Sequence, residues 1–389
     1  MTSIKVSLIK NIKDIDQSIW DSCACPEVKN GSRPIDPFTT FRFLSALEES
    51  KSVGEGTGWI PHYLLAKDSG VVVAVMPLYL KSHSQGEYIF DHNWAQAYTQ
   101  AGGRYYPKFQ ISVPFTPVSG RRILAKQGME MVAGSALIEA TKKIAKDNNV
   151  SSIHLTFCTE KEVGCSQQWD LLDRKNLQYH WTNIGYENFD HFLSHLSSRK
   201  RKAVKRERRT ALEFGGKIQQ LTGNDITPDV WDSFWNFYQD TGQRKWGTPY
   251  LTRSFFDIMQ ENMREDILLV IAERHQKPIA AALNFIGRDS LYGRYWGCSE
   301  DHSCLHYELC YYQAIDYAIR NKLSSVEAGA QGEHKVARGY LPSITNSMHW
   351  FSNKDFSRAV ENYLTEEKLI MDDQYMQILK EGPFKTVLD

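Results

Sequence analysis

Acidic, imidazole and cationic side chains are concentrated in one loop towards the C-terminal end of the sequence. Residues 329–339 hold three glycines, Gly329, Gly332 and Gly339. Glycine permits positive φ angles and lets the backbone approach a ligand closely, so this composition is typical of a binding loop. The other side chains of the loop can accept protons, donate them or stabilise negative charge. The candidates are Gln331, Glu333, His334, Lys335 and Arg338.

A second group of candidate residues precedes this loop. His306 and Glu308 lie at the start of an apolar stretch with helical spacing, so only one of them can point fully into a cleft. Before them, Arg294, Tyr295 and Trp296 belong to an aromatic segment bounded by glycines, which is typical of a strand. A structural interpretation stays open for each group: aromatic residues in a core, Glu308 as a helix cap, and a solvated charged loop.

A strand–helix–strand unit must position these residues. Residues 291–298 are predicted as a strand and residues 324–330 as a short strand that leads into the loop. Loops held by a rigid sheet present polar groups to ligands, so the unit is the predicted centre of function. The helix between the two strands, residues 305–323, is indicated by the spacing of Leu305, Leu309, Tyr312, Ile315 and Ile319.

A strongly basic segment lies near the middle of the chain. Within residues 199–209, eight side chains are basic and only Glu207 is acidic. Good helix formers and the pair Gly215 and Gly216 predict a helix that ends there. Like charges at this density repel one another along a helix, which favours a polyanionic or phosphate-bearing partner over a merely solvated face. The basic residues are Arg199, Lys200, Arg201, Lys202, Lys205, Arg206, Arg208 and Arg209.

The amino-acid composition is typical of a folded protein of ordinary polarity. The 389 residues carry a formal net charge of zero, so any electrostatic binding must come from a local patch. Seven scattered cysteines without a Cys-x-x-Cys pair indicate reduced thiols in a cytoplasmic protein. The start of the chain lacks a signal-peptide core, and the longest apolar run, Val71 to Leu80, is too short to span a bilayer. Peripheral membrane contact and the oligomeric state stay open.

A metal site is not expected from this sequence. A zinc site formed by Cys298, Cys304, His306 and Cys310 is the one arrangement that the spacing suggests, and it is disfavoured. No tightly bound cofactor is predicted either.

The two halves of the chain repeat one order of elements. Each half is predicted to contain a strand, two helices, two or three antiparallel strands, a long helix and a further strand. In the first half the long helix covers residues 128–148, followed by a strand over residues 152–157 and a helix over residues 166–175. Residues 92–117 are predicted to be irregular and rich in aromatic side chains.

The chain resembles a bacterial family of FemAB-like N-acyltransferases associated with peptidoglycan biosynthesis or recognition. This resemblance implies an α+β fold of two GNAT-like domains in tandem, with mixed, largely antiparallel sheets flanked by helices. It places the N-terminal domain at residues 1–185, a basic helical connector at 186–216 and the C-terminal domain at 217–389. The segments that carry it are His92–Ala95, Tyr105–Lys108, Pro114–Pro117, Ser198–Lys202, Gly293–Gly297, Leu305–Glu308 and Gly329–Gly339.

The resemblance implies either aminoacyl-tRNA or acyl-CoA as the donor of the transferred group. GNAT enzymes that use acetyl-CoA carry a glycine-rich loop before the long helix, whose amides hold a pyrophosphate. Here the corresponding residues 298–303 contain no glycine and two acids, and residues 117–122 substitute for the loop only in part. Aminoacyl-tRNA therefore fits better, with the basic residues of 199–209 in contact with its phosphates.

The leading hypothesis is transfer of an activated acyl or aminoacyl group onto an amine, such as that of a cell-wall or peptide precursor. Two alternatives stay open: a recognition module without catalysis for a cell-wall precursor or RNA, and an acyl-CoA-dependent N-acetyltransferase. Substitution of Glu308 or His334 by Ala should abolish transfer without unfolding the protein. Proposed roles are base for His306, Glu308, Glu333 and His334, charge stabilisation for Lys335 and Arg338, and substrate binding for Arg294, Tyr295, Trp296, Gln331, Tyr106 and Lys108.

Overall fold

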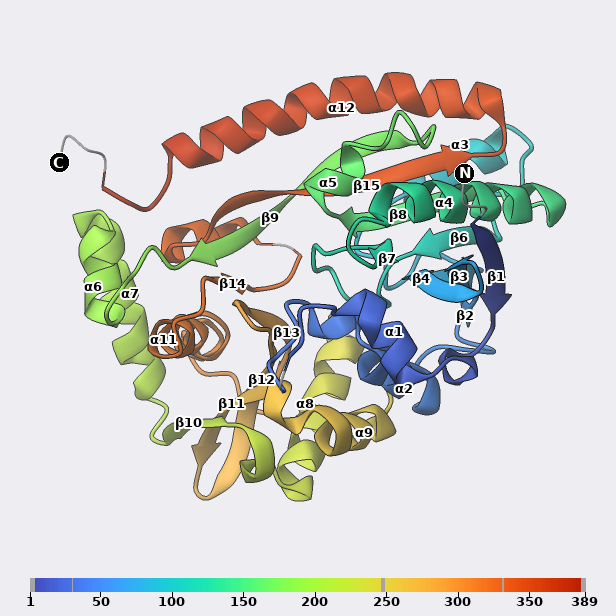
Figure 1. Ribbon diagram of the computed structural model, residues 1–389. Coiled ribbons are helices and arrows are strands. Elements are labelled where there is room, and N and C mark those ends of the chain that lie inside the picture. Colours follow the sequence, from blue (N-terminus) through green and yellow to red (C-terminus); the bar gives the residue numbers. More distant parts are fainter. Residues whose placement is uncertain (1–3, 30, 246–248, 331, 386–389) are drawn as a thin grey trace. The chain divides into compact units, whose positions relative to one another are not determined.

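A computed structural model describes residues 4–29, 31–245, 249–330 and 332–385 (Figure 1). By their internal contacts the residues divide into two compact units. The first contains residues 1–31, 38–177 and 344–374, and the second contains residues 32–37, 178–343 and 375–389.

The first unit contains two groups of paired strands. Strands β1 (Lys5–Ile9), β3 (Tyr63–Asp68), β4 (Val71–Met76) and β7 (Leu124–Ala125) form an antiparallel sheet in the order β1-β3-β4-β7. The second group runs in the order β2-β5-β6-β8-β15, and only β6 and β8 are parallel. Its strands are β2 (Trp59–Pro61), β5 (Leu78–Lys81), β6 (Lys108–Ile111), β8 (Ser152–Cys158) and the part of β15 (Leu341–Phe351) from Ile344 onward.

Helix α4 (Glu130–Asp147) connects the two parallel strands of this unit and supplies much of its core. Its buried Ala133, Leu137, Ile138 and Ala145 pack with apolar residues of β3, β4, β6 and β8. The remaining helices are α1 (Gln17–Ala24), α2 (Phe41–Glu49), α3 (His92–Gln100), α5 (Glu160–Val163) and the part of α12 (Lys354–Lys380) up to Gln374.

The second unit repeats the arrangement of a mostly antiparallel sheet with one parallel pair. Its strands run in the order β10-β11-β12-β13-β14-β9, and only β13 and β14 are parallel. They are β10 (Lys217–Leu221), β11 (Ile267–Arg274), β12 (Lys277–Ile286), β13 (Ser290–Cys298), β14 (Ser325–Glu327) and the part of β9 (Leu172–Thr182) from Gln178 onward.

A helix again connects the parallel strands. It consists of α10 (Leu305–Tyr307), a π-helical turn over Glu308–Tyr312, and α11 (Gln313–Arg320). The apolar side chains of this helix pack against β11, β12 and β13 in the core of the unit. The other helical segments are α6 (Phe189–His195), α7 (Ser198–Leu212), α8 (Pro228–Lys245), α9 (Arg253–Met263) and the 3₁₀ turn η6 (Glu333–Arg338).

The predicted α+β class, the strand–helix–strand units and the basic helix are confirmed, whereas two local predictions are wrong. Within residues 92–117, predicted to be irregular, residues 92–100 form α3 and residues 108–111 form β6. Helix α3 buries only Trp94, so the sequence shows no apolar period there. The helix predicted over residues 166–175 is replaced by turns and by β9, because pairing of this strand within a sheet outweighs a weak helix propensity.

The division by contacts differs from the predicted domains at the C-terminal end. Strand β15 pairs with β8 from Asn346 to Phe351, and residues 344–374 therefore belong to the first unit. Domain boundaries at residues 185 and 217 stay a prediction.

Candidate functional site

A cavity opens in the second unit where the parallel strands β13 and β14 stop pairing. Their last paired residues are Tyr292 and Glu327, after which β13 continues to Cys298 while β14 ends. The cavity has a volume of about 100 Å³. Its lining consists of Ala282, Leu283, Asn284, Gly293, Arg294, Tyr295, Trp296, His306, Cys310, Tyr311 and Ala328.

A β-bulge lies on the cavity wall. Leu283 of β12 pairs with Tyr295 of β13, and the next residue, Asn284, pairs with Gly293. Arg294 is therefore an extra residue in β13, and the bulge re-aims the chain on the wall of the cavity that Arg294 lines.

The π-helical turn places two side chains on the opposite wall. It widens the helix at Glu308–Tyr312, and Cys310 and Tyr311 from this turn line the cavity together with His306. Such turns within α-helices occur frequently at functional sites. The ring of His306 lies 5.1 Å from that of Trp296 and 5.4 Å from that of Tyr311, measured between centroids.

Tyr311 connects the cavity to the glycine-containing loop. Its hydroxyl lies 2.9 Å from Nε2 of His334, and either group can donate the hydrogen bond. Burial raises the pKa of the Tyr311 hydroxyl well above its ordinary value, so this group keeps its proton at neutral pH. Tyr311 is therefore suited to donate a proton to a leaving group, with His334 as the partner that replaces it.

Glu308 points away from the cavity. It is 1% exposed, and Arg208 of α7 donates to both of its carboxylate oxygens at 2.9 and 3.1 Å. Gln313 donates a further hydrogen bond of 2.8 Å to Glu308. Of the two predicted bases on this helix, His306 thus faces the cavity and Glu308 faces α7. A catalytic role for Glu308 stays a prediction.

Two charged residues of the loop that were predicted to stabilise charge, Lys335 and Arg338, make contacts within the protein. Lys335 is 2% exposed and donates to the carbonyl oxygen of Gly329 at 3.0 Å, and burial lowers its pKa to about 8. Arg338 pairs with Glu207 of α7 at 2.9 Å. Its guanidinium lies 3.4 Å above the ring of Tyr307. Glu333 is exposed, and Gln331 lies outside the described residues.

Helix α7 has two distinct faces. Val204 and Ala211 are buried, and Glu207 and Arg208 make the ion pairs described above on the same side. At about 100° per residue, the exposed basic residues fall within an arc of about 120° on the other side. This cationic stripe consists of Arg199, Lys202, Lys205, Arg206 and Arg209. One of them, Lys205, lies 3.5 Å from Asp190.

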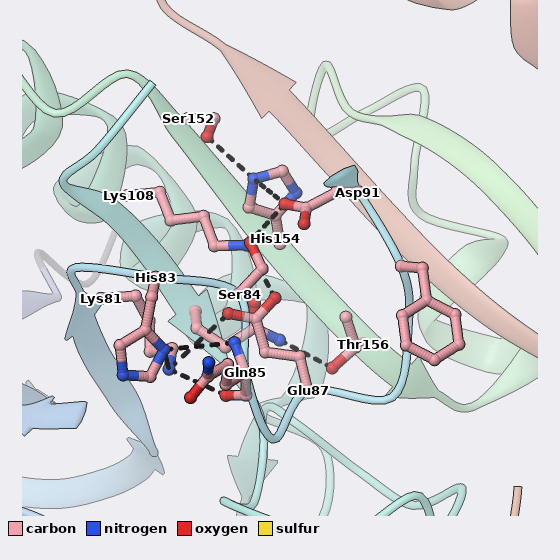
Figure 2. Close-up of polar contacts among 12 residues, drawn as sticks. Lys81, His83, Ser84, Gln85, Glu87, Asp91, Lys108, Ser152, His154 and Thr156 are labelled. Atoms are coloured by element: carbon pink, nitrogen blue, oxygen red, sulfur yellow. Dashed lines mark hydrogen bonds and ion pairs between the residues drawn. The ribbon is translucent and has the colours of Figure 1, made fainter. Parts of the chain in front are cut away.

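A cluster of buried charges occupies the first unit (Figure 2). The ammonium group of Lys108 on β6 donates to Ser84, Glu87 and Asp91 at 2.8, 2.7 and 2.5 Å. Those three acceptors all belong to the loop of residues 82–91. Lys81 of β5 lies 3.8 Å from Glu87, and its amine is 3.7 Å above the ring of Trp59.

Burial determines the protonation of this cluster. It raises the pKa of Glu87 to about 7 and lowers that of Lys81 to about 7. Burial alone would also raise the pKa of Asp91, but the ammonium of Lys108 holds that pKa well below its ordinary value. The Lys108–Asp91 pair is therefore charged at neutral pH, whereas Lys81 and Glu87 are poised to exchange a proton.

Two neutral histidines extend the cluster across neighbouring strands. Burial lowers the pKa of His154 on β8 to about 3 and lowers that of His349 on β15 well below its ordinary value. Their Nδ1 atoms lie 2.7 Å apart, so one ring donates and the other accepts. The hydroxyl of Tyr105 donates to Asp91 at 2.7 Å and lies 3.3 Å from His154.

The predicted substrate-binding residues Tyr106 and Lys108 both contact this cluster. The hydroxyl of Tyr106 lies 2.8 Å from that of Ser84, to which Lys108 also donates. Lys108 is fully buried with all three of its N–H groups bonded to the loop, so its role in substrate binding stays a prediction. Sequence reasoning missed Glu87, Asp91 and His154, although polar and apolar residues alternate along β6 and β8.

A carboxylate lies at each of the two loops that were compared with a pyrophosphate site. In the first unit, the amides of Arg122 and Ile123 donate to the carboxylate of Glu162 at 2.6 and 2.8 Å. In the second unit, Glu300 pairs with Arg274 and His302. A carboxylate already occupies the place of an anion in the first loop, and an acid repels one in the second.

The carboxyl group of Glu327 makes the stability of the second unit depend on pH. Burial, and after it the carboxylate of Asp36, raises the pKa of Glu327 to about 8 from an ordinary value of 4.5. The stability that this group contributes is therefore fully present below pH 4.5 and is lost as the pH rises to about 8. Glu327→Gln should remove this loss, so the variant should gain free energy of unfolding relative to the parent protein across this range.

Urea unfolding at several pH values measures this difference. Glu261→Gln, a substitution at an exposed glutamate of α9 in the same unit, serves as the control and should follow the parent at every pH. Parallel pH curves for the parent and Glu327→Gln would contradict the assignment.

Among the described residues, no three His, Cys, Asp or Glu side chains gather in a way that could hold a metal ion. The alternative zinc site at Cys298, Cys304, His306 and Cys310 therefore gains no support. In the part of the chain that the structure describes, no helix combines the length and apolarity needed to cross a membrane.

Solved structures with a similar fold include FemX, at 13% identity and a TM-score of 0.54, covering 91% of this chain and 100% of FemX. The C-terminal domain of a putative lysylphosphatidylglycerol synthetase from Agrobacterium fabrum is 9% identical with a TM-score of 0.52, covering 78% of this chain and 88% of that one. A conserved protein of unknown function from Bacteroides thetaiotaomicron is 10% identical with a TM-score of 0.50, covering 90% and 99%. At these identities the likeness concerns the fold.

No protein with a curated function matches this sequence. Residues 11–386 match the FemAB-like family, which is described by its part in peptidoglycan biosynthesis or recognition. The chain has an α+β fold similar to that of FemX, and it belongs to the FemAB-like family.

Proposed function

We propose that this protein transfers an acyl or aminoacyl group onto an amine of a cell-wall peptide precursor. The observation that carries this proposal is the cavity where β13 and β14 stop pairing, which is lined by both His306 and Tyr311. His306 offers a base for the attacking amine, and Tyr311 offers a proton for a leaving group. Acyl transfer to an amine uses a base and an acid in these two roles. FemAB-like and GNAT-like proteins are transferases, which agrees with this reaction.

The reaction follows from these positions. The amine attacks the carbonyl carbon of the donor, the new C–N bond forms, and negative charge develops on the carbonyl oxygen. His306 takes the proton that the amine loses. The bond to the leaving group then breaks, and the leaving oxygen or sulfur receives the proton of Tyr311. His334 returns a proton to Tyr311.

Aminoacyl-tRNA is the donor that we propose. The amides of the first-unit loop are taken by Glu162, and the second-unit loop contains Glu300, so neither favours the pyrophosphate of coenzyme A. The cationic stripe of α7 instead offers an extended row of charge to a phosphate backbone. No tightly bound cofactor is required by this reaction.

Product formation tests the proposal. The protein is incubated with an amine-bearing cell-wall peptide and either aminoacyl-tRNA or acetyl-CoA, and the mass of the peptide is measured. A mass increase of one aminoacyl group with tRNA supports the proposal. An acetyl increase would make the protein a CoA-dependent N-acetyltransferase, and an unchanged peptide that still binds would make it a recognition module.

Neutralising four residues of the stripe should weaken tRNA binding. The variant keeps Arg208, which pairs with Glu308. It carries four substitutions: Arg199→Gln, Lys202→Gln, Arg206→Gln and Arg209→Gln. Each lost phosphate contact lowers the salt dependence of binding, so the slope of log affinity against log salt should fall by about 3. Fluorescence anisotropy at several salt concentrations measures it.

The control for this variant carries four Lys→Gln changes at exposed lysines of the first unit, Lys5, Lys10, Lys51 and Lys143. It changes the net charge by the same amount away from α7. An equal loss of affinity in both variants would show that net charge, rather than the stripe, governs binding.

A further inference from the structure

A second pocket of the second unit lies beside the start of α7. It has a volume of about 450 Å³ and is separate from the cavity between β13 and β14. Its walls combine rings and aliphatic side chains with a few polar groups. The lining consists of Thr182, Ile184, Tyr186, Ser194, His195, Gly339, Leu341, Phe384 and Lys385.

A buried hydrogen-bond donor without a partner lies next to this pocket. Trp181 is fully buried, and its indole Nε1–H has no acceptor among the described residues. A Cβ atom at Gly339 would lie 3.5 Å from Cδ1 of Trp181, the ring atom bonded to Nε1. The N–H edge of the indole therefore faces a residue that lines the pocket. Burying an unsatisfied donor is costly, and this one lies behind the pocket wall and not in its lining.

Positive charge begins directly beyond the pocket. His195 lines it, and α7 starts three residues later at Ser198. Ser197 at the helix N-cap makes no capping bond with its side chain, so the first amides of α7 are not satisfied by a cap. The exposed stripe then runs from Arg199 to Arg209, over about 15 Å at 1.5 Å per residue.

The pocket also adjoins the catalytic cavity. Gly339 and Leu341 line the pocket, and the residue between them, Tyr340, packs its ring 5.6 Å from that of Tyr311. Tyr311 lines the cavity. A ligand held in the pocket is thus one side chain away from the proposed site of transfer.

We propose that this pocket holds an unpaired nucleobase at the 3′ end of an RNA strand whose phosphates follow the stripe on α7. This inference rests on the proposed use of an aminoacylated RNA as donor. Rings such as Tyr186 and Phe384 can stack on a base, and Lys385 can donate to its acceptor atoms. The length of the stripe favours a strand with one phosphate per nucleotide over coenzyme A, whose phosphates gather around a single adenosine.

Binding of RNA without an acyl group tests the pocket. Fluorescence anisotropy compares a hairpin that carries a short unpaired 3′ tail with the same hairpin lacking the tail. The parent protein should bind the tailed hairpin about tenfold more tightly, because a stacked base is lost with the tail. Tyr186→Leu keeps an apolar wall without the ring and should reduce this preference.

A substitution of an exposed residue that lines the pocket gives a second test in a variant that is expected to fold. Ile184 is 67% exposed, so Ile184→Glu should fold normally while placing a negative charge where the tail enters. It should bind both hairpins equally. Val71→Glu changes an exposed apolar residue of the first unit in the same way and should keep the tenfold preference.

Three outcomes would overturn the inference: equal binding of both hairpins by the parent, an equal loss for both hairpins in Ile184→Glu, or displacement of the tail by coenzyme A. These hairpins carry no aminoacyl group, so a protein that fails to transfer can still show the preference for the tail. Conversely, if transfer occurs equally well with and without the tail, the proposed function is retained, but the pocket takes no part in it.

Discussion

Tyr311→Phe should lower the rate of transfer by about 100-fold while the protein remains folded. The substitution removes only the hydroxyl that contacts His334 and that burial keeps protonated. Loss of a positioned general acid typically costs a factor of 10² to 10⁴. The leaving group would then have to take its proton from water. Steady-state rates of peptide modification at saturating donor measure the effect.

A matched control lies on the same helix. Tyr307 stacks on Arg338 and on His334 through its ring, so Tyr307→Phe preserves those contacts and removes a hydroxyl that has no part in the proposed reaction. It should transfer at the parental rate. Tyr311→Phe with parental activity would rule out Tyr311 as the proton donor. A loss confined to KM, with kcat unchanged, would make it a binding residue instead.

Lys108→Met should lower the free energy of unfolding by about 3–5 kcal/mol, the usual cost of removing one partner from a buried ion pair. Glu87 and Asp91 are 4% and 3% exposed, and the ammonium of Lys108 donates to both. Without it, two carboxylates and Ser84 are left in the interior with fewer donors. Urea unfolding followed by circular dichroism measures the loss.

Two further variants separate the ion pair from other effects. Lys5→Met changes an exposed lysine of β1 and should stay within about 0.5 kcal/mol of the parent. Adding Glu87→Gln to Lys108→Met removes one of the orphaned charges, so the double variant should lose less than the sum of the two single changes. Strict additivity would show that Lys108 and Glu87 do not stabilise each other.

Periodicity was sufficient to predict most elements around the cavity. The helix over residues 305–323 and its flanking strands follow from the spacing of apolar residues, and α4 at residues 130–147 matches the predicted 128–148. The π-helical turn is not visible in that spacing, because one widened turn changes which side chains share a face without changing residue types. Tyr311 was missed for that reason, although the helix itself was predicted.

Charge pairing is the part of the site that sequence reasoning could not supply. Arg208 counted as one of eight equivalent basic residues, but it faces Glu308, a residue 100 positions later. Arg338 likewise pairs with Glu207 instead of remaining available to a ligand. Which charges on a helix or loop meet a counter-ion depends on how distant segments pack. Only the exposed stripe of α7 retains the role that the sequence indicated, and contact with tRNA stays a prediction.

The attachment of residues 82–91 determines how this loop can move. Ser84, Glu87 and Asp91 all bond to one nitrogen atom, that of Lys108. Three separate anchors would allow the loop to fray one residue at a time, each step costing a single bond. Anchors that share one atom are lost together once that ammonium is displaced or its two carboxylates take up protons. These three bonds of the loop therefore form and break together, as one cooperative unit.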